Sequence, residues 1–338
     1  NHGMIDRDHN SIWGVNMRLQ PLQAIVAEHI LKTVNETVAA RNKNAKLLDD
    51  YFKFLDVCNT PLPYVVRINT IKTTIQKSTS AFSDLSIDVT PCDWNPLLFQ
   101  MNNSSPGNTL PYLLGWLHGQ EEVSSIPPLV LDPLPGDIVW DACASPGSKT
   151  SQLAALMDDT GFIVANDSNL RRMPALRSNL ERLGVTTAAV THSDARHFSL
   201  KPFDFNTFDS AIVDVPCSGE GTIRKNPRAL QKWSLKKLFS LQKLQIPILR
   251  RAISLVKSGG TVVYSTCTFS PEENEMVVDK ILSEGNCTIV PFELPIVSSP
   301  GLIEWEGNQF NSSLNLCKRI WPNQNNTGGF FIAKLEVK

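Results

Sequence analysis

Two cysteines stand where a reactive side chain would lie, each soon after an apolar run of strand length. Cys217 follows residues 211–213 in the segment DVPCSG, and Cys267 follows residues 261–264 in the segment STCT. A thiol with a carboxylate on the same turn, as Cys217 has in Asp214, can hold the edge of a heterocyclic base and act on its ring. A lone cysteine is more often a small apolar core residue. Two of them at the ends of separate strands favour nucleophilic catalysis.

A third segment, DACASPGSKT at residues 141–150, joins a predicted strand to a predicted helix. Its small residues let the backbone approach a ligand, and the N–H groups at the start of a helix favour a carboxylate or phosphate. The segment has neither the GxxxxGK[ST] spacing of a phosphate loop nor the GxGxxG spacing of a dinucleotide loop. Taken alone, it is equally well explained as a tight turn between strand and helix.

Acidic residues follow three predicted strands in succession. Asp141 opens the small-residue loop, Asp167 ends the next strand and Asp194 follows the third. In doubly wound folds an acid at the end of the second strand commonly binds ribose hydroxyls, and Asp194 is placed to reach an adenine amino group. Each acid alone is more often a helix cap. Three at successive strand ends favour a nucleotide-like ligand.

The elements that position these residues alternate between strand and helix after Gly119, which predicts an α/β fold with a doubly wound, mainly parallel sheet. Ligand-binding residues are then expected at the carboxyl ends of the strands. The predicted strands are residues 138–140, 162–164, 188–190, 211–213 and 261–264. A strong amphipathic helix is predicted over 241–256, kinked at Pro247 and ended by Gly259 and Gly260, and a further helix with acids in its first turn is predicted to start at 270–274.

Before Gly119 the pattern predicts helices over residues 20–54, a strand at 64–68, a short helix at 70–80 and a loop rich in Pro, Asn and Ser at 90–108. We therefore expect three units. These are a helical segment at 1–60, a small α/β subdomain at 61–118 and a catalytic domain at 119–338.

Taken together, the three motifs resemble those of the Sun/Fmu family of RNA 5-methylcytosine methyltransferases, through DACASPGSKT, DVPCSGEGTIRKNP and YSTCTFSPEENE. The resemblance is close over residues 119–280 and looser at 64–69 and 328–331. Residues 119–128 and 221–226 look most like the eukaryotic tRNA-modifying branch. The resemblance implies a Rossmann-like methyltransferase domain that uses S-adenosyl-L-methionine, with a small N-terminal α/β subdomain that binds RNA, and it makes tRNA the expected substrate.

The family's two-cysteine mechanism maps onto matching positions of this sequence. Cys267 resembles the nucleophile that adds to carbon 6 of cytosine, and Cys217 the residue that removes the carbon 5 proton and releases the enzyme. Asp214 resembles the acid that binds nitrogen 3 and the amino edge of cytosine. Lys149 resembles the lysine between the cofactor loop and the base pocket. The target base must be unpaired or flipped out to enter.

The same resemblance assigns the cofactor site. The loop would wrap the methionine part of S-adenosyl-L-methionine, Asp167 its ribose and Asp194 its adenine, with Arg172 as a neighbour. Ser145 and Ser148 depart from the family, which often has Ala and Gly there. The expected cofactor-binding residues are Cys143, Ala144, Ser145, Pro146, Gly147, Ser148, Lys149, Asp167, Arg172, Asp194 and Asp214.

Charge and composition limit the other possibilities. A net charge of −1 argues against a surface that is basic all round, but the stretch from Arg224 to Arg251 has nine Lys and Arg and no acid, which predicts a segment facing phosphates. No apolar run approaches the ~20 residues that span a bilayer. Seven scattered cysteines without CxxC spacing predict no zinc or other metal site and a reducing, intracellular location in nucleus or cytoplasm. We expect a monomer.

Three alternatives stay open at this stage. An rRNA or mRNA cytosine-5 methyltransferase would carry the same motifs. In a DNA cytosine-5 methyltransferase the nucleophile would be Cys217, and Cys267 would have no role. An RNA-binding protein on a retired scaffold would normally have lost a cysteine or a cofactor acid, and this chain keeps both cysteines and all three strand-end acids.

Overall fold

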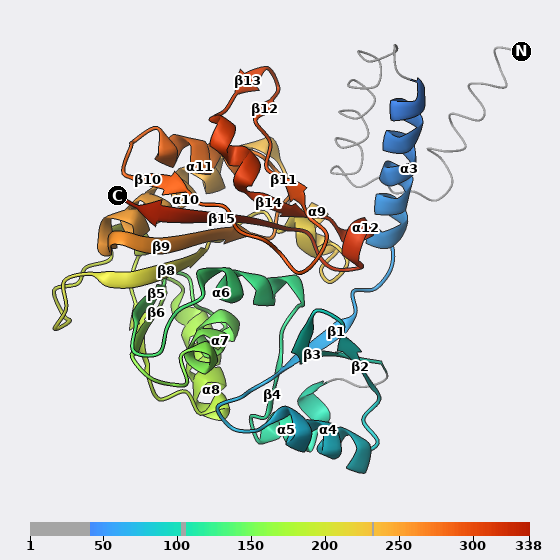
Figure 1. Cartoon of the computed structure of the whole chain (residues 1–338), viewed down its shortest axis with the longest axis vertical. Helices are drawn as coiled ribbons and strands as arrows, with labels where there is room; N and C mark the ends of the chain where they lie inside the picture. Colours follow the sequence, from blue (N-terminus) through green and yellow to red (C-terminus); the bar gives the residue numbers. More distant parts are fainter. Residues whose placement is uncertain (1–40, 103–105, 232) are drawn as a thin grey trace, which may run out of the picture.

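The computed structural model describes residues 41–102, 106–231 and 233–338 (Figure 1). Most of the helical pattern predicted for residues 20–54 lies outside these residues. Its last part is helix α3 (Arg41–Cys58). Phe54, Leu55 and Cys58 of this helix are buried against Ile223 and Phe269, so α3 packs beside the segments that carry the two cysteine motifs.

A small antiparallel sheet follows α3, with strand order β2-β3-β1-β4. The predicted strand at 64–68 is confirmed as β1. The helix predicted at 70–80 begins later, at Ile75, because the Thr74 hydroxyl caps it by accepting a hydrogen bond from Lys77 N at 3.2 Å. The strands are β1 (Tyr64–Ile68), β2 (Val89–Cys92), β3 (Asn95–Met101) and β4 (Leu117–Gly119), and the helices are α4 (Ile75–Asp84) and α5 (Leu110–Leu113).

The loop predicted at residues 90–108 is wrong in its middle part, where the structure has β3. The Pro, Asn and Ser residues around this strand are typical of loops. Its apolar residues nevertheless pair with β1 and are buried, Leu98 fully and Phe99 and Met101 nearly so. Burial of β3 residues on both faces of the small sheet therefore outweighs the local composition.

The larger sheet has nine strands, and its main path runs β11-β14-β15-β9-β8-β5-β6-β7, with β10 paired to β15. Its five parallel strands confirm the five predicted ones, extended at one or both ends: β5 (Ile138–Asp141), β6 (Phe162–Asp167), β7 (Ala188–His192), β8 (Phe208–Asp214) and β9 (Val256–Thr266). The antiparallel strands are β10 (Cys287–Ile289), β11 (Ser299–Pro300), β14 (Lys318–Ile320) and β15 (Phe330–Val337), and β12 (Glu304–Trp305) pairs with β13 (Asn308–Gln309) as a separate hairpin.

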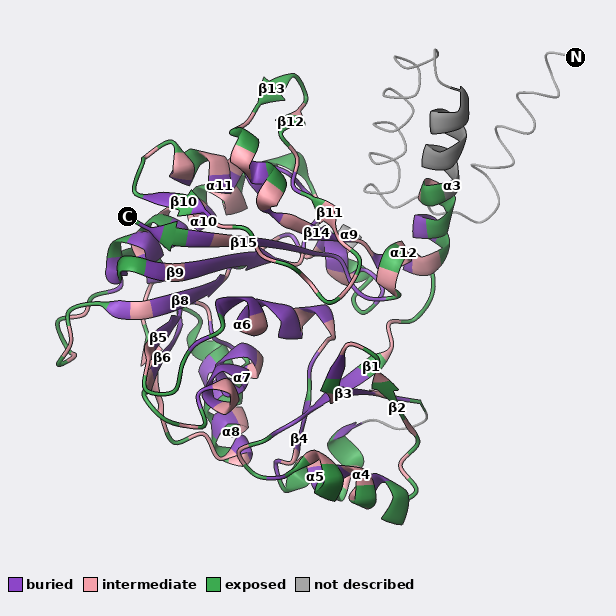
Figure 2. Cartoon of the chain, viewed as in Figure 1, coloured by how far each residue is buried: buried purple, intermediate pink, exposed green. Residues whose placement is uncertain are grey.

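Helices cover both faces of this sheet, as Figure 1 shows, and Figure 2 shows its strands as largely buried. On one face Val139 and Val263 pack with residues of α6 and α7, and on the other Trp140 and Tyr264 pack with residues of α10 and α11. Adjacent residues of one strand thus enter different cores, as expected for parallel strands buried on both sides. The helices are α6 (Ile126–Leu131), α7 (Ser148–Leu156), α8 (Met173–Leu183), α9 (Arg228–Gln231), α10 (Leu235–Leu255), α11 (Glu275–Leu282) and α12 (Pro322–Asn325).

Two predicted helix boundaries are wrong. Helix α10 continues through Pro247 and ends at Leu255, and Gly259 and Gly260 lie inside β9. A Cβ at Gly260 would stand 2.5 Å from the Asp209 carbonyl oxygen, so the glycine is required by close approach of β8 where the pairing shifts register and not by a helix end. Helix α11 starts at Glu275, and the acids expected in its first turn precede it.

Candidate active site

The parallel sheet brings the three motifs to one edge. Strand β8 pairs with β9 so that Asp214 lies opposite Ser265, and β5 pairs with β8 on its other side. The loops after these strands therefore meet, although their residues lie far apart in the sequence. The residues singled out from the cysteine motifs and Lys149 of the small-residue loop form one constellation.

The two cysteine sulfurs are 3.2 Å apart, within hydrogen-bonding reach of each other, and both thiols are partly buried. The neighbouring Cys267 sulfur, and then burial, raise the pKa of the Cys217 thiol well above its usual value. Cys217 therefore keeps its proton at neutral pH and can donate it toward Cys267. This arrangement places a neutral S–H group against the Cys267 sulfur.

The Asp214 carboxylate is held on both oxygens. Lys149 Nζ lies 2.6 Å from Oδ2 and Ser265 Oγ donates to Oδ1 at 2.9 Å. Lys149 also donates to Ser124 Oγ at 2.9 Å, and its side chain is only 9% exposed against 29% for Asp214. A buried lysine paired with a more open carboxylate leaves the carboxylate edge available to a ligand.

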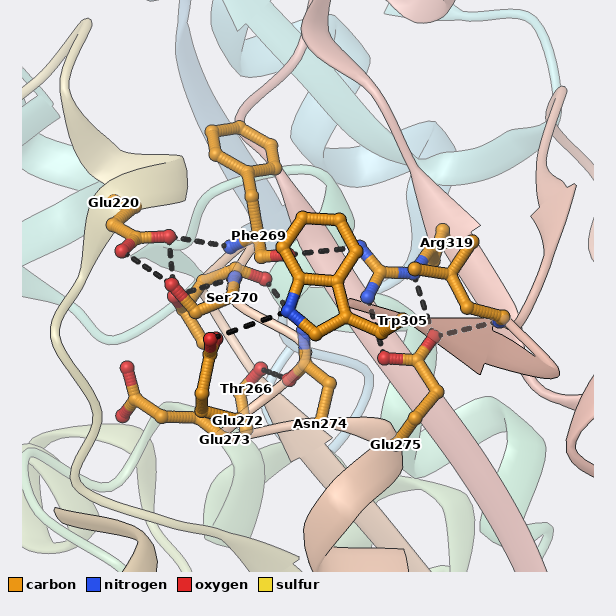
Figure 3. Close-up of polar contacts among 12 residues, drawn as sticks. Glu220, Thr266, Phe269, Ser270, Glu272, Glu273, Asn274, Glu275, Trp305 and Arg319 are labelled. Carbon is orange, nitrogen blue, oxygen red and sulfur yellow. Dashed lines mark hydrogen bonds and ion pairs between the residues drawn. The ribbon is translucent and has the colours of Figure 1, made fainter. Parts of the chain in front are cut away.

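Behind the cysteines, the buried Glu220 carboxylate binds the segment that follows Cys267 (Figure 3). Oε2 accepts from Thr268 Oγ1 at 2.8 Å and from Phe269 N at 3.0 Å, and Oε1 accepts from Ser270 Oγ at 2.6 Å and from the Trp233 indole N–H. Because Glu220 belongs to the Cys217 motif, its carboxylate joins the two cysteine segments.

A second set of buried polar contacts joins the same two segments. The Glu273 carboxylate accepts from Ser218 N at 3.0 Å and from Gln245 Nε2 at 2.8 Å. Burial raises the pKa of Glu273 to about 7. Asn274 accepts from Thr266 Oγ1 at 2.5 Å and donates to Thr268 O at 3.0 Å. The backbone on both sides of Cys267 is therefore fixed by side chains from the turn before α11.

Figure 3 also shows the ion pair of Arg319 and Glu275, whose closest atoms are 2.5 Å apart. Arg319 Nη1 donates to Phe269 O at 2.9 Å. Both partners are almost fully buried, with side chains 4% and 0% exposed. This pair links β14 to the segment after Cys267, so loss of one partner would leave a buried charge next to the site.

The small-residue loop has the features of a ligand cradle. Gly147 has φ +101° directly before α7, and a Cβ there would stand 3.1 Å from Leu176. Ser145 N donates to Asp167 Oδ2 at 3.1 Å, and Arg172 donates to Ser145 O and lies 3.4 Å from the same carboxylate. The buried Ser145 hydroxyl has no hydrogen-bond partner in the described structure. A polar ligand in the loop would satisfy it.

Asp141 and Cys143 are buried at the start of this loop. Thr150 Oγ1 donates to Asp141 Oδ2 at 2.7 Å, and Oδ1 finds no partner among the described residues. Burial raises the pKa of Asp141 to about 7 and raises the pKa of the Cys143 thiol well above its usual value. Cys143 is therefore a neutral thiol, which fits a role in lining the loop and not in attack.

Asp194 differs from Asp141 and Asp167 because its carboxylate forms a close ion pair with the neighbouring Arg196. It caps the short turn at residues 195–197, and its Oδ2 lies 2.6 Å from Arg196 Nη2. The hydrogen bonds from Arg196 lower the pKa of Asp194. Its side chain is 39% exposed, so the carboxylate is reachable from solvent.

Part of the basic stretch at residues 224–251, which was predicted to face phosphates, is engaged within the fold. Arg224 is buried and donates to Thr60, Pro61, Asn326 and Thr327. Arg250 pairs with Glu284 and Arg251 donates to Phe198 O. Arg224 and Arg251 thereby connect segments of the fold, whereas Arg250 forms a surface ion pair. Lys225, Arg228, Lys236 and Lys243 are exposed, and Lys232 lies outside the described residues.

The part of the chain that the structure describes contains no helix long and apolar enough to cross a membrane. In the same residues, no three His, Cys, Asp or Glu side chains gather in a way that could hold a metal ion.

Residues 128–336 match the family model described as 16S rRNA methyltransferase RsmB/F. The chain belongs to this family. The resemblance to the Sun/Fmu family is thereby confirmed, and with it the predicted Rossmann-like fold and, as the reaction of the family, methylation of cytosine carbon 5 in RNA.

Curated relatives carry both tRNA and rRNA names. A tRNA (cytosine(49)-C(5))-methyltransferase of Pyrococcus abyssi is 37% identical over 90% of this chain and 96% of its own length. A human 28S rRNA (cytosine(4447)-C(5))-methyltransferase is 36% identical over 86% of this chain, which spans 36% of that protein. The ribosomal RNA small subunit methyltransferase F of Shewanella sediminis is 33% identical, and the chain spans 59% of it.

Solved structures share the architecture. A methyltransferase homologue from Pyrococcus horikoshii has a TM-score of 0.76 at 32% identity, with 85% of this chain and 90% of that chain covered. NSun6 from the same organism has a TM-score of 0.74 over 86% of this chain and 94% of that chain, and at 21% identity this likeness concerns the fold alone.

Behind the residues that the sequence singled out lie others to which it assigned no role. Ser124, Glu220, Glu273 and Arg319 were not assigned a role. Glu220 lies inside the motif DVPCSGEGT, so an acid three residues after Cys217 was the available signal. Nothing local marks Arg319, which reaches the site only because β14 lies in the same sheet.

Proposed function

We propose that the chain transfers a methyl group from S-adenosyl-L-methionine to carbon 5 of a cytosine in tRNA, with Cys267 as nucleophile. The observation that carries the proposal is the grouping of two thiols 3.2 Å apart with the Lys149–Asp214 pair at one edge of the sheet. A DNA-type enzyme needs only the cysteine of the Pro-Cys motif. Here both cysteine segments are fixed by buried side chains, which supports a role for both.

The loop at residues 143–149 with Asp167, Arg172 and Asp194 would hold S-adenosyl-L-methionine. When bound, this cofactor supplies an electrophilic methyl group. The unpartnered Ser145 hydroxyl and the first N–H groups of α7 suit the carboxylate of its amino-acid part. The Asp167 carboxylate lies at the end of β6, where a ribose hydroxyl can donate to it.

The residues of the cysteine site perform the remaining chemistry. The Cys267 sulfur adds to carbon 6 of cytosine, which makes carbon 5 nucleophilic, while the Asp214 carboxylate accepts a hydrogen bond from the amino group of the base. Once carbon 5 is methylated, Cys217 takes the proton from carbon 5 and the bond between carbon 6 and the Cys267 sulfur breaks. Cys217 must first give its own proton to water. Addition turns the Cys267 sulfur into a neutral thioether, which removes the largest cause of the raised Cys217 pKa and makes this loss easier. The carbon 5 proton then restores the Cys217 thiol as Cys267 leaves as a thiolate.

The choice of tRNA is supported by the archaeal relative named for tRNA, which is 37% identical and is covered over 96% of its length.

The test incubates wild type, Cys267→Ala and Cys217→Ala with labelled S-adenosyl-L-methionine and, separately, total tRNA, rRNA fragments and DNA. We expect label in tRNA as 5-methylcytosine, no product and no adduct with Cys267→Ala, and a denaturation-resistant protein–RNA adduct with Cys217→Ala. Cys92→Ala, which removes a partly buried thiol of the small sheet, is the matched control and should behave as wild type.

Label in rRNA alone would overturn the choice of tRNA but keep the mechanism. An adduct formed by Cys267→Ala, or label in DNA, would instead assign the attack to Cys217 and favour the DNA-type alternative.

A further inference from the structure

His118 connects the small sheet to the cofactor loop. It lies on β4, is 3% exposed, and its Nε2 is 2.8 Å from the hydroxyl of Ser148, the first residue of α7. On the other side of the ring, Arg182 Nη2 is 3.0 Å from His118 Nδ1. The histidine thus stands between an arginine of α8 and a residue of the loop that would hold the methionine part of the cofactor.

The partners of the ring decide where its proton lies. Arginine can only donate, so Nδ1 must accept and the single proton of a neutral imidazole is on Nε2. Burial, together with Arg67 and Arg182, lowers the pKa of His118 to about 3, so the ring stays neutral. Nε2–H therefore donates to Ser148 Oγ, and the hydroxyl hydrogen of Ser148 is left free to donate elsewhere.

The rest of the same interface makes this geometry rigid. Arg67 donates to Gln120 Oε1 at 2.8 Å and to Ser151 Oγ at 2.9 Å, one turn along α7 from Ser148. Asn69 donates to Leu183 O at 2.7 Å at the end of α8. The small sheet is therefore fixed to α7 and α8 by buried hydrogen bonds. Among the described residues of this sheet, His118 contacts the side chain of Ser148 in the proposed cofactor loop.

We propose that His118 is a positioning residue for cofactor binding: it orients the Ser148 hydroxyl so that this group donates to the carboxylate of S-adenosyl-L-methionine. This inference rests on the proposed cofactor site. It also gives a reason for Ser148, where the family often has Gly, because only a hydroxyl can both accept from His118 and donate to the ligand. The small sheet then contributes to cofactor affinity through His118.

The test measures the dissociation constant for S-adenosylhomocysteine by calorimetry for wild type, His118→Ala, Ser148→Ala and the double variant. One lost hydrogen bond should weaken binding about 3- to 10-fold in each single variant, and the double variant should be no weaker than the single ones, since both act through one hydroxyl. His118→Gln, whose amide can donate to Ser148, should regain most of the affinity.

Lys72→Ala is the matched control. Lys72 donates to Arg182 O at 2.8 Å across the same interface but does not contact the loop, so the variant should keep wild-type affinity. Two results would overturn the inference: unchanged affinity in Ser148→Ala, or equal weakening by Lys72→Ala. If wild type itself does not bind S-adenosylhomocysteine, the proposed function fails instead. Melting temperatures of all variants separate a binding effect from unfolding.

Discussion

The cysteine segments and the cofactor loop lie at the same edge of the sheet but are held in different ways. Behind Cys217 and Cys267, the carboxylates of Glu220 and Glu273 are buried and accept hydrogen bonds from both segments. The proposed cofactor loop is shaped by Gly147 and by the Asp167 and Arg172 side chains, which bind the Ser145 backbone, and it keeps a buried hydroxyl at Ser145 without a partner in the described residues. The two proposed reacting cysteines thus lie on a hydrogen-bonded support, whereas the proposed cofactor loop keeps an unused polar group.

This difference follows from the task of each part. A nucleophile must be held within about 0.5 Å of the position from which it can attack. This requires supporting hydrogen bonds that do not change when substrate binds. A cofactor loop must give up no internal bonds when the ligand enters, so unpaired donors are an advantage. Substitutions behind the cysteines should thus lower the rate of the chemical step, and substitutions in the loop should lower affinity.

The largest effect that sharpens this comparison is expected for Glu220→Gln. The amide cannot accept on the oxygen it replaces, so at least one hydrogen bond to a buried carboxylate is lost, at a cost of about 1.5–3 kcal/mol. We expect kcat to fall at least ~10-fold while the dissociation constant for S-adenosylhomocysteine stays within about twofold. The measurements are single-turnover methylation and calorimetry.

Glu284→Gln is the control for Glu220, because it removes a surface glutamate paired with Arg250 and should change neither quantity. A clear loss of cofactor affinity with Glu220→Gln would show that the two parts of the site are not separate.

Asp167→Asn should give the opposite result. Asp167 accepts from Ser145 N and from Asn169 N at 2.8 Å, and an amide can replace only one acceptor oxygen. We expect cofactor binding to weaken about 10-fold, as for one lost charge-assisted hydrogen bond, with kcat at saturating cofactor unchanged. Calorimetry and kinetics at saturating cofactor test this, and a fall in kcat with unchanged affinity would contradict it.

Asp141→Asn should change how stability depends on pH. The folded chain raises the pKa of this carboxyl from 3.8 to about 7, so the folded state keeps a proton that the unfolded chain releases. The protonated Asp141 side chain contributes fully to the free energy of unfolding below pH ~4, and this contribution is lost as pH rises toward ~7. The asparagine variant stays neutral, and Thr150 can still donate to its oxygen. Its melting temperature should therefore fall less than that of wild type between these pH values.

The exposed Asp132 provides the comparison for Asp141, since Asp132→Asn should keep the pH dependence of wild type. Parallel curves for wild type and Asp141→Asn would mean that Asp141 is ionised throughout.

The smallest effect is expected for Asp194→Asn. The carboxylate is 39% exposed and already accepts hydrogen bonds from Arg196, and solvent screens such an exposed ion pair. An asparagine still offers one oxygen to an adenine amino group. Cofactor affinity should fall by less than about fivefold, and a loss as large as that of Asp167→Asn would mean that Asp194 is as firmly built into the site as Asp167.

Much of the fold could be predicted because its signals are local. Apolar runs located the five parallel strands, and small or polar residues after them located Cys217, Cys267 and the cofactor loop. The predicted roles of these residues, the cofactor contacts and the division into three units remain predictions. The strand β3 was missed because residues typical of loops surround it, and its stability comes from pairing with β1.

What the sequence could not provide is the pairing of distant polar groups. Glu220 and Ser270 are 50 positions apart, and Arg319 and Glu275 are 44 apart. Such contacts depend on which strands become neighbours, and no local pattern encodes that order. Composition was also a poor guide to which basic side chains of residues 224–251 are exposed. Arg224 and Lys225 carry the same charge, but Arg224 is buried and Lys225 is exposed.

Strand β15 lies between β9 and β14, although it is the last strand of the described chain to leave the ribosome. Just before it, Gly329 N donates to Gly221 O at 2.9 Å, and Gly221 N donates to Cys267 O at 2.9 Å. The two cysteine segments are thus hydrogen-bonded to each other and to Gly329, which is synthesised some sixty positions after Cys267. A nascent chain therefore completes this arrangement only after β15 has been synthesised, and we expect a shortened product that lacks β15 to be inactive and to leave an open edge at β9.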